Sequence, residues 1–418
     1  MRGRKERSPV TAVAALKKRQ GELAQEHDTP EVTRSRRAVI AALGTSQTLA
    51  WASSYYLPAI LADPIGASID VPRTWVFGAF SVALLIAAFA GPAVGRIIDR
   101  QGGRGVLLLS NIVLAAGLVV LAAATGPAGL FAAWVVLGVG MSLGLYDAGF
   151  ATLTALYGKH ARGPITGITL FAGFASTVSW PLSTFLNDAV GWRETLLVWA
   201  ALNIVIGLPL NMLLPIPARL AHHLQTAGDS VGWKPYKEMV LLAFVFAAAW
   251  FVTGSMAAHL PRLLERAGAT PLQAIAAAAL VGPAQVAARL VEFVILRRAH
   301  PLVSARLAAL LHPIGAAVFA VAGAPAAAVF AIFYGAGNGL LTIARGTVPL
   351  AVFGPQGYGE RTGLLGAPAR AAQALAPLLF GLLLDVMGAS VIIVSAALCL
   401  AAFAALLCLH ASRPQYQL

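Results

Sequence analysis

Charge is what this sequence has least of. Only 11% of its 418 residues are Asp, Glu, Lys or Arg, whereas an ordinary soluble domain has about 25% charged residues. The hydrophobic share is 58%. Water solvates a surface with so few charges poorly, so we expect most of the surface to contact lipid. The scarcity of charge therefore argues against a soluble protein.

Cysteine and recognisable catalytic motifs are also scarce. Cys399 and Cys408 are the two cysteines, and both lie in the last apolar run. A disulfide framework or a thiolate metal site is therefore not expected. The sequence has no HExxH, no His/Cys cluster with metal-ligand spacing and no nucleotide-binding loop. We therefore expect no metal, no cofactor, no drive by ATP and no enzymatic activity.

Apolar runs are abundant. After a basic tail over residues 1–36, twelve stretches are each long enough to cross ~30 Å of hydrocarbon as a helix. The predicted spans are 37–62, 73–95, 105–123, 129–156, 164–187, 194–214, 237–259, 272–296, 304–322, 326–352, 362–387 and 391–410. A polar loop at 215–236 separates the first six (37–214) from the last six (237–410), and 411–418 form a polar end. The sequence predicts an all-α integral membrane protein of two six-helix bundles.

The net charge of +13 is concentrated between these runs. Of 30 Lys and Arg residues, 23 fall on the side of the tail and the central loop. This bias places both termini in the cytoplasm. Because the charges lie in the tail and in short loops, we expect a lipid bilayer and not nucleic acid as a partner. A small-molecule substrate and a monomeric state are further expectations. The Ala, Gly and Arg content favours a bacterial inner membrane.

The two halves repeat short motifs in the same order. Gly91-Pro92-Ala93 recurs as Gly282-Pro283-Ala284, and Arg162 recurs as Arg361. With two further pairs, the offsets all lie between 191 and 199 residues. Such a repeat indicates a duplicated six-helix unit, as in transporters built from structural repeats.

The most specific motif is the loop after the second run, Gly95-Arg96-Ile97-Ile98-Asp99-Arg100-Gln101-Gly102-Gly103-Arg104. It resembles the signature loop of the major facilitator superfamily, which latches the two halves together. The resemblance assigns this role to Gly95, Asp99, Arg100, Gly102 and Arg104. Asp99 can accept hydrogen bonds from a neighbouring helix N-terminus. The corresponding second loop, 296–300, lacks the Asp, so we expect a one-sided latch.

The chain also resembles one branch of that superfamily. The stretch 55–104 and His259-Leu260-Pro261 are similar to the monocarboxylate-porter and oxalate/formate-exchanger branch. That branch often carries an Arg in helix 8 and a cation in helix 11, and Arg289 and Arg370 stand at those places. Two features of proton-coupled drug antiporters are missing. The Arg of their helix 4 is absent, with Trp134 near its place, and the Gly-Pro of their helix 5 is Trp180-Pro181 here.

Five charged residues lie deep in predicted helices 4, 8, 10 and 11, which the resemblance places at the cavity or the seam: Asp147, Arg289, Glu292, Arg345 and Arg370. Each ionised group at mid-membrane costs roughly 2.5–3.5 kcal/mol, so we expect them to face water, each other or a substrate. Arg289 and Glu292 share a helix face and can pair. Asp147 and Arg345 can bridge the cavity. Arg370 has no evident partner in its own helix, which makes it the best candidate for an anion contact.

These residues lead to a hypothesis for the site. We expect Arg289, Arg345 and Arg370 to hold an anionic or polar substrate, assisted by Gln47, Trp51, Tyr55 and Tyr56 of the polar first helix. Asp147 and Glu292 are candidates for proton coupling or for a gate. The predicted function is secondary transport by alternating access of a small organic anion such as a monocarboxylate. Efflux of a drug or metalloid, and a non-transporting sensor on the same fold, remain open.

Overall fold

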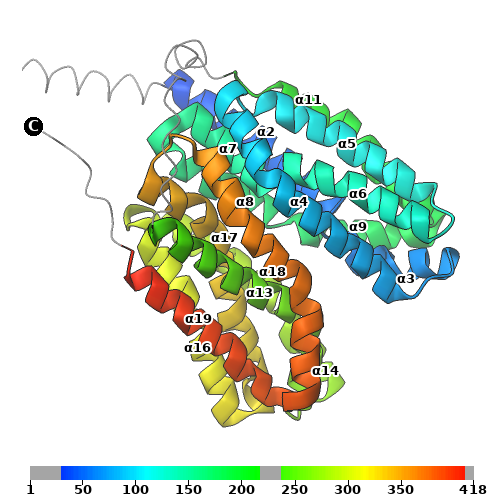
Figure 1. Ribbon diagram of the computed structural model, residues 1–418, viewed down its shortest axis with the longest axis vertical. Coiled ribbons are helices and arrows are strands. Elements are labelled where there is room, and N and C mark those ends of the chain that lie inside the picture. Colours follow the sequence, from blue (N-terminus) through cyan, green and yellow to red (C-terminus); the bar gives the residue numbers. More distant parts are fainter. Residues whose placement is uncertain (1–29, 217–236, 410–418) are drawn as a thin grey trace, which may run out of the picture.

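The structure is a computed structural model that describes residues 30–216 and 237–409. These residues form helices and no strand. Figure 1 shows two helical lobes side by side, the first built from blue to green segments and the second from green to red ones. The predicted tail up to residue 29, nearly all of the central loop and the polar C-terminal end lie outside the described residues.

The first half begins with α2 (Pro30–Ala52) and α3 (Pro58–Ser68). It continues with α4 (Arg73–Gln101), α5 (Arg104–Ala122), α6 (Pro127–Gly144), α7 (Tyr146–Tyr157), α8 (Arg162–Ala172), α9 (Ala175–Val190), α10 (Trp192–Leu202), the π-helical turn η2 (Asn203–Gly207) and α11 (Leu208–Met212). The second half contains α13 (Lys237–Arg266), α14 (Pro271–Ala279), α15 (Val281–Val294), the turn η3 (Leu296–Arg298), α16 (Pro301–Ala322), α17 (Ala327–Phe353), α18 (Tyr358–Met387) and α19 (Ile392–Leu407).

Twelve membrane-crossing segments can be traced through the described residues, as predicted. Ten stretches are long and apolar enough to span a membrane, and the last of them contains both α18 and α19. The pair α2 and α3 supplies the remaining segment at the N-terminal end. Several segments consist of two helices in line, such as α6 with α7 and α14 with α15.

The first segment differs from its predicted bounds of 37–62. Helix α2 begins at Pro30, so residues 30–36, expected in the tail, are helical. A helix satisfies its own backbone hydrogen bonds and can therefore continue past the edge of the hydrocarbon. There Arg36 donates to the carbonyl of His160 at 3.0 Å and lies over the ring of Tyr157.

Two of the membrane-crossing segments, the first and the fourth, are each interrupted by a break in the helix. Helix α2 ends at Ala52, and α3 starts at Pro58, which has no backbone N–H to continue the ladder. In the fourth segment Leu145 is extended (φ −81°, ψ −172°) and separates α6 from α7. Discontinuous helices of this kind build the binding sites of many secondary transporters.

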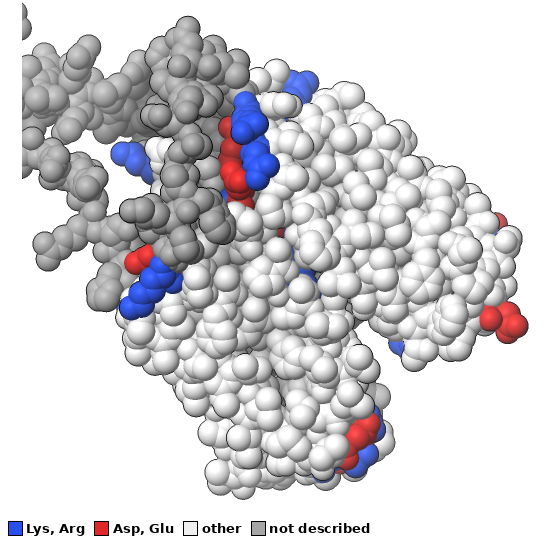
Figure 2. Space-filling view, viewed as in Figure 1, with Lys and Arg blue, Asp and Glu red and all other residues white. Residues whose placement is uncertain are grey.

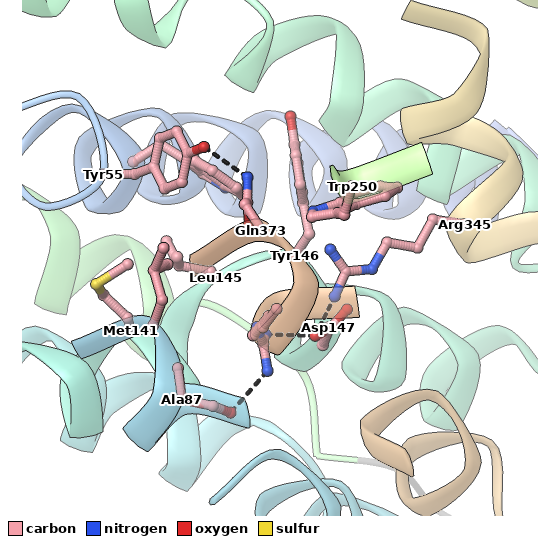
Figure 3. A pocket seen from close by; sticks show the side chains of 12 residues that line it. Tyr55, Ala87, Met141, Leu145, Tyr146, Asp147, Trp250, Arg345 and Gln373 are labelled. Carbon is pink, nitrogen blue, oxygen red and sulfur yellow. Dashed lines mark hydrogen bonds and ion pairs between the residues drawn. The ribbon is translucent and has the colours of Figure 1, made fainter. Parts of the chain in front are cut away.

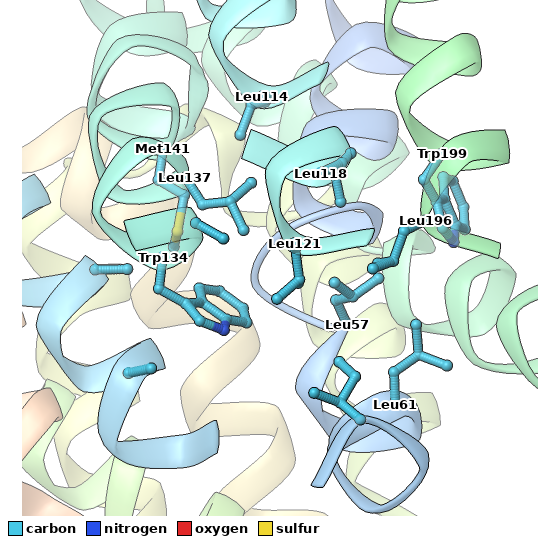
Figure 4. Packing of buried hydrophobic residues seen from close by; sticks show 14 of the residues in the cluster. Leu57, Leu61, Leu114, Leu118, Leu121, Trp134, Leu137, Met141, Leu196 and Trp199 are labelled. Carbon is cyan, nitrogen blue, oxygen red and sulfur yellow. The ribbon is translucent and has the colours of Figure 1, made fainter. Parts of the chain in front are cut away.

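Each half has its own packed core. In the first half, Leu57 and Leu61 beside the break pack with leucines of α5 and α10 and belong to the same cluster as Trp134 (Figure 4). Lipid tails are as apolar as leucine, so close packing and polar contacts between helices hold such a core together.

The surface is that of a membrane protein. Large apolar side chains such as Phe89 (82% exposed), Val321 (91%) and Val386 (86%) lie on the outside. Figure 2 shows charged side chains gathered near the ends of the two lobes, with an almost uncharged surface between them. The chain is therefore a multi-pass membrane protein.

Candidate functional site

A small, partly open central cavity lies between the halves (Figure 3). It is lined by Trp51, Tyr55, Leu84, Ala87, Met141, Leu145, Tyr146, Asp147, Trp250, Arg345, Arg370 and Gln373. Helices of both halves contribute to this wall, so a molecule bound there would touch both.

Asp147 is the anionic centre of the cavity. It lies in the first turn of α7, directly after the break at Leu145. Arg345 of α17 donates to its Oδ2 at 2.7 Å, and Arg370 of α18 donates to the same oxygen. Its Oδ1 is buried and has no hydrogen-bond partner among the described residues. The positive end of α7 also points at this carboxylate.

These contacts test two predictions. The bridge between Asp147 and Arg345 is confirmed, with 198 residues between the partners. Arg370 has no partner in its own helix, as expected, but it is paired with other helices: besides Asp147, its Nη1 donates to the carbonyl of Ala87 at 2.7 Å. A search for partners within α18 could not find either of these two contacts of Arg370.

The cavity carries a net charge of +1, from two guanidiniums and one carboxylate. All three side chains are nearly buried, at 6–8% exposure. The guanidinium of Arg345 also lies 4.6 Å from the ring centre of Trp250, a cation–π contact. A buried excess positive charge favours an anionic ligand.

Arg289 forms a second buried cationic centre outside the cavity lining. Its contacts are long: 3.5 Å to Thr169 O, 3.4 Å to Gln285 Oε1 and 3.5 Å to Thr342 Oγ1. Its Nε has no partner among the described residues. Thr342 and Arg345 are three residues apart on α17, so Arg289 lies about one helical turn from the cavity cation.

The predicted pair of Arg289 with Glu292 is wrong. Glu292 instead accepts from Arg162 of α8 at 3.0 Å and from the hydroxyl of Ser304. Arg289 and Glu292 lie three positions apart on α15, but Arg162 of the other half is the cation that pairs with Glu292. Glu292 is thus part of a contact between the halves, away from the cavity.

The first-helix candidates divide into two groups. Trp51 and Tyr55 line the cavity, whereas Gln47 donates to the carbonyl of Gly144 beside the α6–α7 break. Tyr56 is absent from the cavity lining and packs its ring against Trp51 and Trp180.

Besides four aliphatic wall residues, the sequence predictions missed three polar or aromatic ones: Tyr146, Trp250 and Gln373. Gln373 donates through Nε2 to Tyr55 Oη at 2.6 Å, across the seam between the halves. A signal was available, because Gln373 follows Arg370 by three residues and shares its helix face.

The signature loop makes the predicted contact. Asp99 accepts from the backbone N–H groups of Gly359 (2.8 Å) and Glu360 (2.9 Å), at the start of α18. Gly95 permits this approach, since a Cβ atom there would overlap the backbone of Gly359. Gly102, at φ 79°, ends α4 in a conformation that favours glycine. We call this face of the molecule the latch side.

The basic residues of the loop differ from the prediction. Arg96 forms an ion pair with Glu360 at 2.7 Å across the seam. Neither Arg100 nor Arg104 has a hydrogen bond or ion pair within the described part of the chain. Arg96 and Arg100 lie one turn apart on α4. Arg96 is at the level of Glu360 on α18 and therefore reaches the other half.

Arg162 joins the halves through a second contact, opposite in charge to that of Asp99, which the expected one-sided latch did not include. Arg162, at the start of α8, donates to the carbonyls of Leu296 (3.1 Å) and Ala299 after α15, in addition to Glu292. The helix dipole favours a cation at the carbonyl end of a helix, as it favours the anion Asp99 at the N–H end of α18.

Comparison with known proteins decides the family. Residues 39–344 match the Major Facilitator Superfamily. The chain belongs to the major facilitator superfamily. The two six-helix bundles predicted from the sequence are thus those of the major facilitator fold.

Two relatives share 29% identity with this major facilitator. One is an uncharacterized 38 kDa protein in the 23S RNA operon of Thermoproteus tenax, over 163 residues (39% of this chain, 42% of the relative). The other is an MFS-type efflux pump of Mycolicibacterium smegmatis, over 223 residues (50% of each). The chain spans half or less of the length of these curated relatives.

Solved structures confirm the fold alone. The human organic anion transporter MFSD10 (TETRAN) aligns with a TM-score of 0.67 at 20% identity, over 91% of this chain and 100% of that one. The proton:xylose symporter XylE aligns with a TM-score of 0.72 at 12% identity, over 89% and 95%.

Proposed function

We propose that this transporter carries a small organic anion by alternating access, with the substrate carboxylate taking the place of Asp147 between Arg345 and Arg370. The observation that supports this most is the sharing of one carboxylate oxygen by two buried guanidiniums. Asp147 acts here as an internal stand-in for the substrate.

Anion binding at this place would be coupled to movement of the halves. Asp147 belongs to the first half, and Arg345 and Arg370 belong to the second, so their ion pairs tie the halves together. The two oxygens of a substrate carboxylate can accept hydrogen bonds from both guanidiniums. It would thereby release Asp147 and weaken the central tie. A ligand shifts a conformational equilibrium only through such differences in contact between states.

The described conformation is closed on the latch side. Asp99 and Arg162 both join the halves there, while Figure 2 shows a notch between the lobes on the opposite side. With both termini in the cytoplasm, as the charge bias predicts, the cavity would open outward in this state. We propose Asp147 as the central gate and Glu292 as a member of the latch.

Arg370→Gln tests the proposal. In proteoliposomes, wild-type protein should exchange a labelled organic anion from a panel of acetate, lactate, oxalate and benzoate. The variant should lose more than tenfold in exchange rate, because truncating a buried ion-pair partner typically costs 2–5 kcal/mol. Arg73→Gln, at an exposed pair with Asp63, serves as the control. Wild-type exchange by folded Arg370→Gln protein would refute the assignment.

Efflux of a toxic compound is the second candidate. It is supported by the similarity to the mycobacterial efflux pump and by the aromatic cavity wall. A deletion strain would separate the two functions: efflux predicts hypersensitivity and raised intracellular drug, whereas anion transport predicts altered growth on organic acids. Exchange of any labelled solute would exclude a non-transporting sensor.

A further inference from the structure

The cavity has two chemically different ends. The cationic end holds Asp147, Arg345 and Arg370, and the neutral end holds Trp51, Tyr55 and Gln373. Arg370 and Gln373 are three residues apart on α18, so the ends are separated along that helix by roughly 4.5 Å. Figure 3 shows the Tyr55–Gln373 hydrogen bond apart from the Asp147 ion pairs. A ligand bound between the halves would meet both ends.

The neutral end offers two unused hydrogen-bond donors. The indole Nε1–H of Trp51 is buried and without a partner among the described residues, although Trp51 belongs to the cavity wall. The Tyr55 hydroxyl accepts from Gln373, and no acceptor for its own proton lies among the described residues. An unpaired buried donor costs free energy that a ligand oxygen can recover. This end therefore suits a hydrogen-bond acceptor.

Flat apolar surfaces lie between the ends. The Trp51 ring contacts Tyr55 at 5.0 Å and Tyr146 at 4.8 Å between ring centres. Trp250 lies against Arg345, and Leu84 and Met141 complete this part of the wall. A sugar would bury hydroxyls against these groups without partners, which is unfavourable. A flat hydrocarbon body would instead find aromatic contacts.

Charge limits the ligand further. The substrate carboxylate replaces the one Asp147 carboxylate between Arg345 and Arg370, so one negative charge restores the ion pairs of the cationic end. A dicarboxylate would bring its second charge to the neutral end, whose wall residues Trp51, Tyr55 and Gln373 carry no charge. The cavity therefore favours a monoanion.

From this geometry we infer that the substrate is an amphipathic aromatic monocarboxylate with a hydrogen-bond acceptor on the ring opposite the carboxylate, and that Trp51 and Tyr55 determine this specificity. The inference rests on the proposed anion transport. The carboxylate lies between Arg345 and Arg370, the ring lies against Trp51, Tyr146 and Trp250, and the acceptor receives the indole and phenol protons.

Competition against labelled benzoate exchange in proteoliposomes tests the substrate class. The unlabelled competitors are 4-hydroxybenzoate, the near-isosteric 4-methylbenzoate, acetate, succinate and neutral benzyl alcohol. We expect 4-hydroxybenzoate to compete roughly threefold to tenfold better than 4-methylbenzoate, the effect of one or two neutral hydrogen bonds. Acetate, succinate and benzyl alcohol should each be at least tenfold weaker.

Trp51→Phe tests the donor, because it keeps an aromatic ring and removes the N–H. The preference for 4-hydroxybenzoate over 4-methylbenzoate should shrink by at least threefold, and this ratio is independent of any loss of overall affinity that the smaller ring causes. Tyr55→Phe is an independent second test with the same expectation. Trp75→Phe, an identical change at a 47% exposed position outside the cavity, should leave the preference unchanged.

The outcomes separate the two levels of the proposal. If acetate or succinate competes as well as benzoate, or both variants retain the preference, the aromatic specificity is refuted and anion transport stands. If no anion is exchanged or competes while neutral or cationic compounds are transported, both proposals fail.

Discussion

Asp147 links three helices through one oxygen. Its Oδ2 accepts from Arg345 and Arg370, and the residue itself starts α7. Removing one partner of a buried ion pair leaves an uncompensated charge and is strongly unfavourable. At the scale of single residues, the cavity is therefore arranged so that one internal carboxylate can be exchanged for an external one.

Asp147→Asn should separate binding from transport. Without the internal carboxylate, both guanidiniums are free for the substrate, so the KM for the transported anion should fall by about tenfold, equivalent to ~1.4 kcal/mol. The maximal exchange rate should also fall by at least tenfold, because nothing competes to release the substrate. Kinetics of exchange in proteoliposomes measure both quantities. Asp63→Asn, at an exposed pair, is the control, and an unchanged KM in Asp147→Asn would contradict the exchange mechanism.

At the scale of elements, the break in the first segment is held by a ladder of buried amides. Asn203 donates to Ser53 Oγ at 2.9 Å and accepts from Asn111 at 3.3 Å, and Asn211 donates to Asn111 at 2.7 Å. Ser179 donates to the carbonyl of Ala52 at 2.9 Å, where α2 ends. The ladder supplies partners for polar groups at the break that lipid could not satisfy. It thereby positions Trp51 and Tyr55.

Asn203→Leu should loosen this break. Ser53 and Asn111 would each lose a buried partner, at a cost of ~1–3 kcal/mol per group. We expect a lower midpoint of thermal unfolding in detergent and a KM raised at least threefold, with a smaller change in maximal rate. Asn187→Leu, on the exposed part of α9, controls for the substitution type. A lower midpoint with an unchanged KM would reduce the ladder to a purely structural role.

At the scale of the whole molecule, two contacts of opposite sign close the latch side. Asp99 accepts from the N–H end of α18, and Arg162 donates to the carbonyl end of α15 and η3. The Arg96–Glu360 pair adds to the first of them. Each contact is broken if the halves separate on this side, so together they favour the state closed there.

Asp99→Asn should open the latch side. The loss of charge weakens two hydrogen bonds to backbone N–H groups, and a shift of ~1.4 kcal/mol changes the open population about tenfold. In a background with Cys399 and Cys408 replaced by Ser, Thr362→Cys reports opening, since Thr362 is buried at this seam. Labelling by a maleimide should accelerate about tenfold in Asp99→Asn and in Arg162→Gln.

Arg100→Gln is the matched control, because Arg100 is exposed and has no partner among the described residues. Its labelling rate should equal that of the parent. Acceleration as large as in Asp99→Asn would instead support the latch role that the family resemblance assigns to Arg100.

The sequence alone determined the membrane class, the twelve spans and the inward burial of the five deep charges, because hydropathy and the cost of charge in lipid act on every residue separately. It also predicted the Asp147–Arg345 bridge and the contact of Asp99 with a helix N-terminus. The roles of these residues in transport, and the cytoplasmic termini, stay predictions.

Only the tertiary structure decided the partners of Arg370 and Glu292, the placement of Gln47 and Tyr56 outside the cavity wall, and the reversed latch at Arg162. Spacing along a sequence specifies which side chains are neighbours on one helix. A long guanidinium pairs with whatever acceptor an adjoining helix presents, and that depends on the rotation and depth of both helices. Sequence spacing does not encode the rotation and depth of the helices. The packing of the two halves determines both.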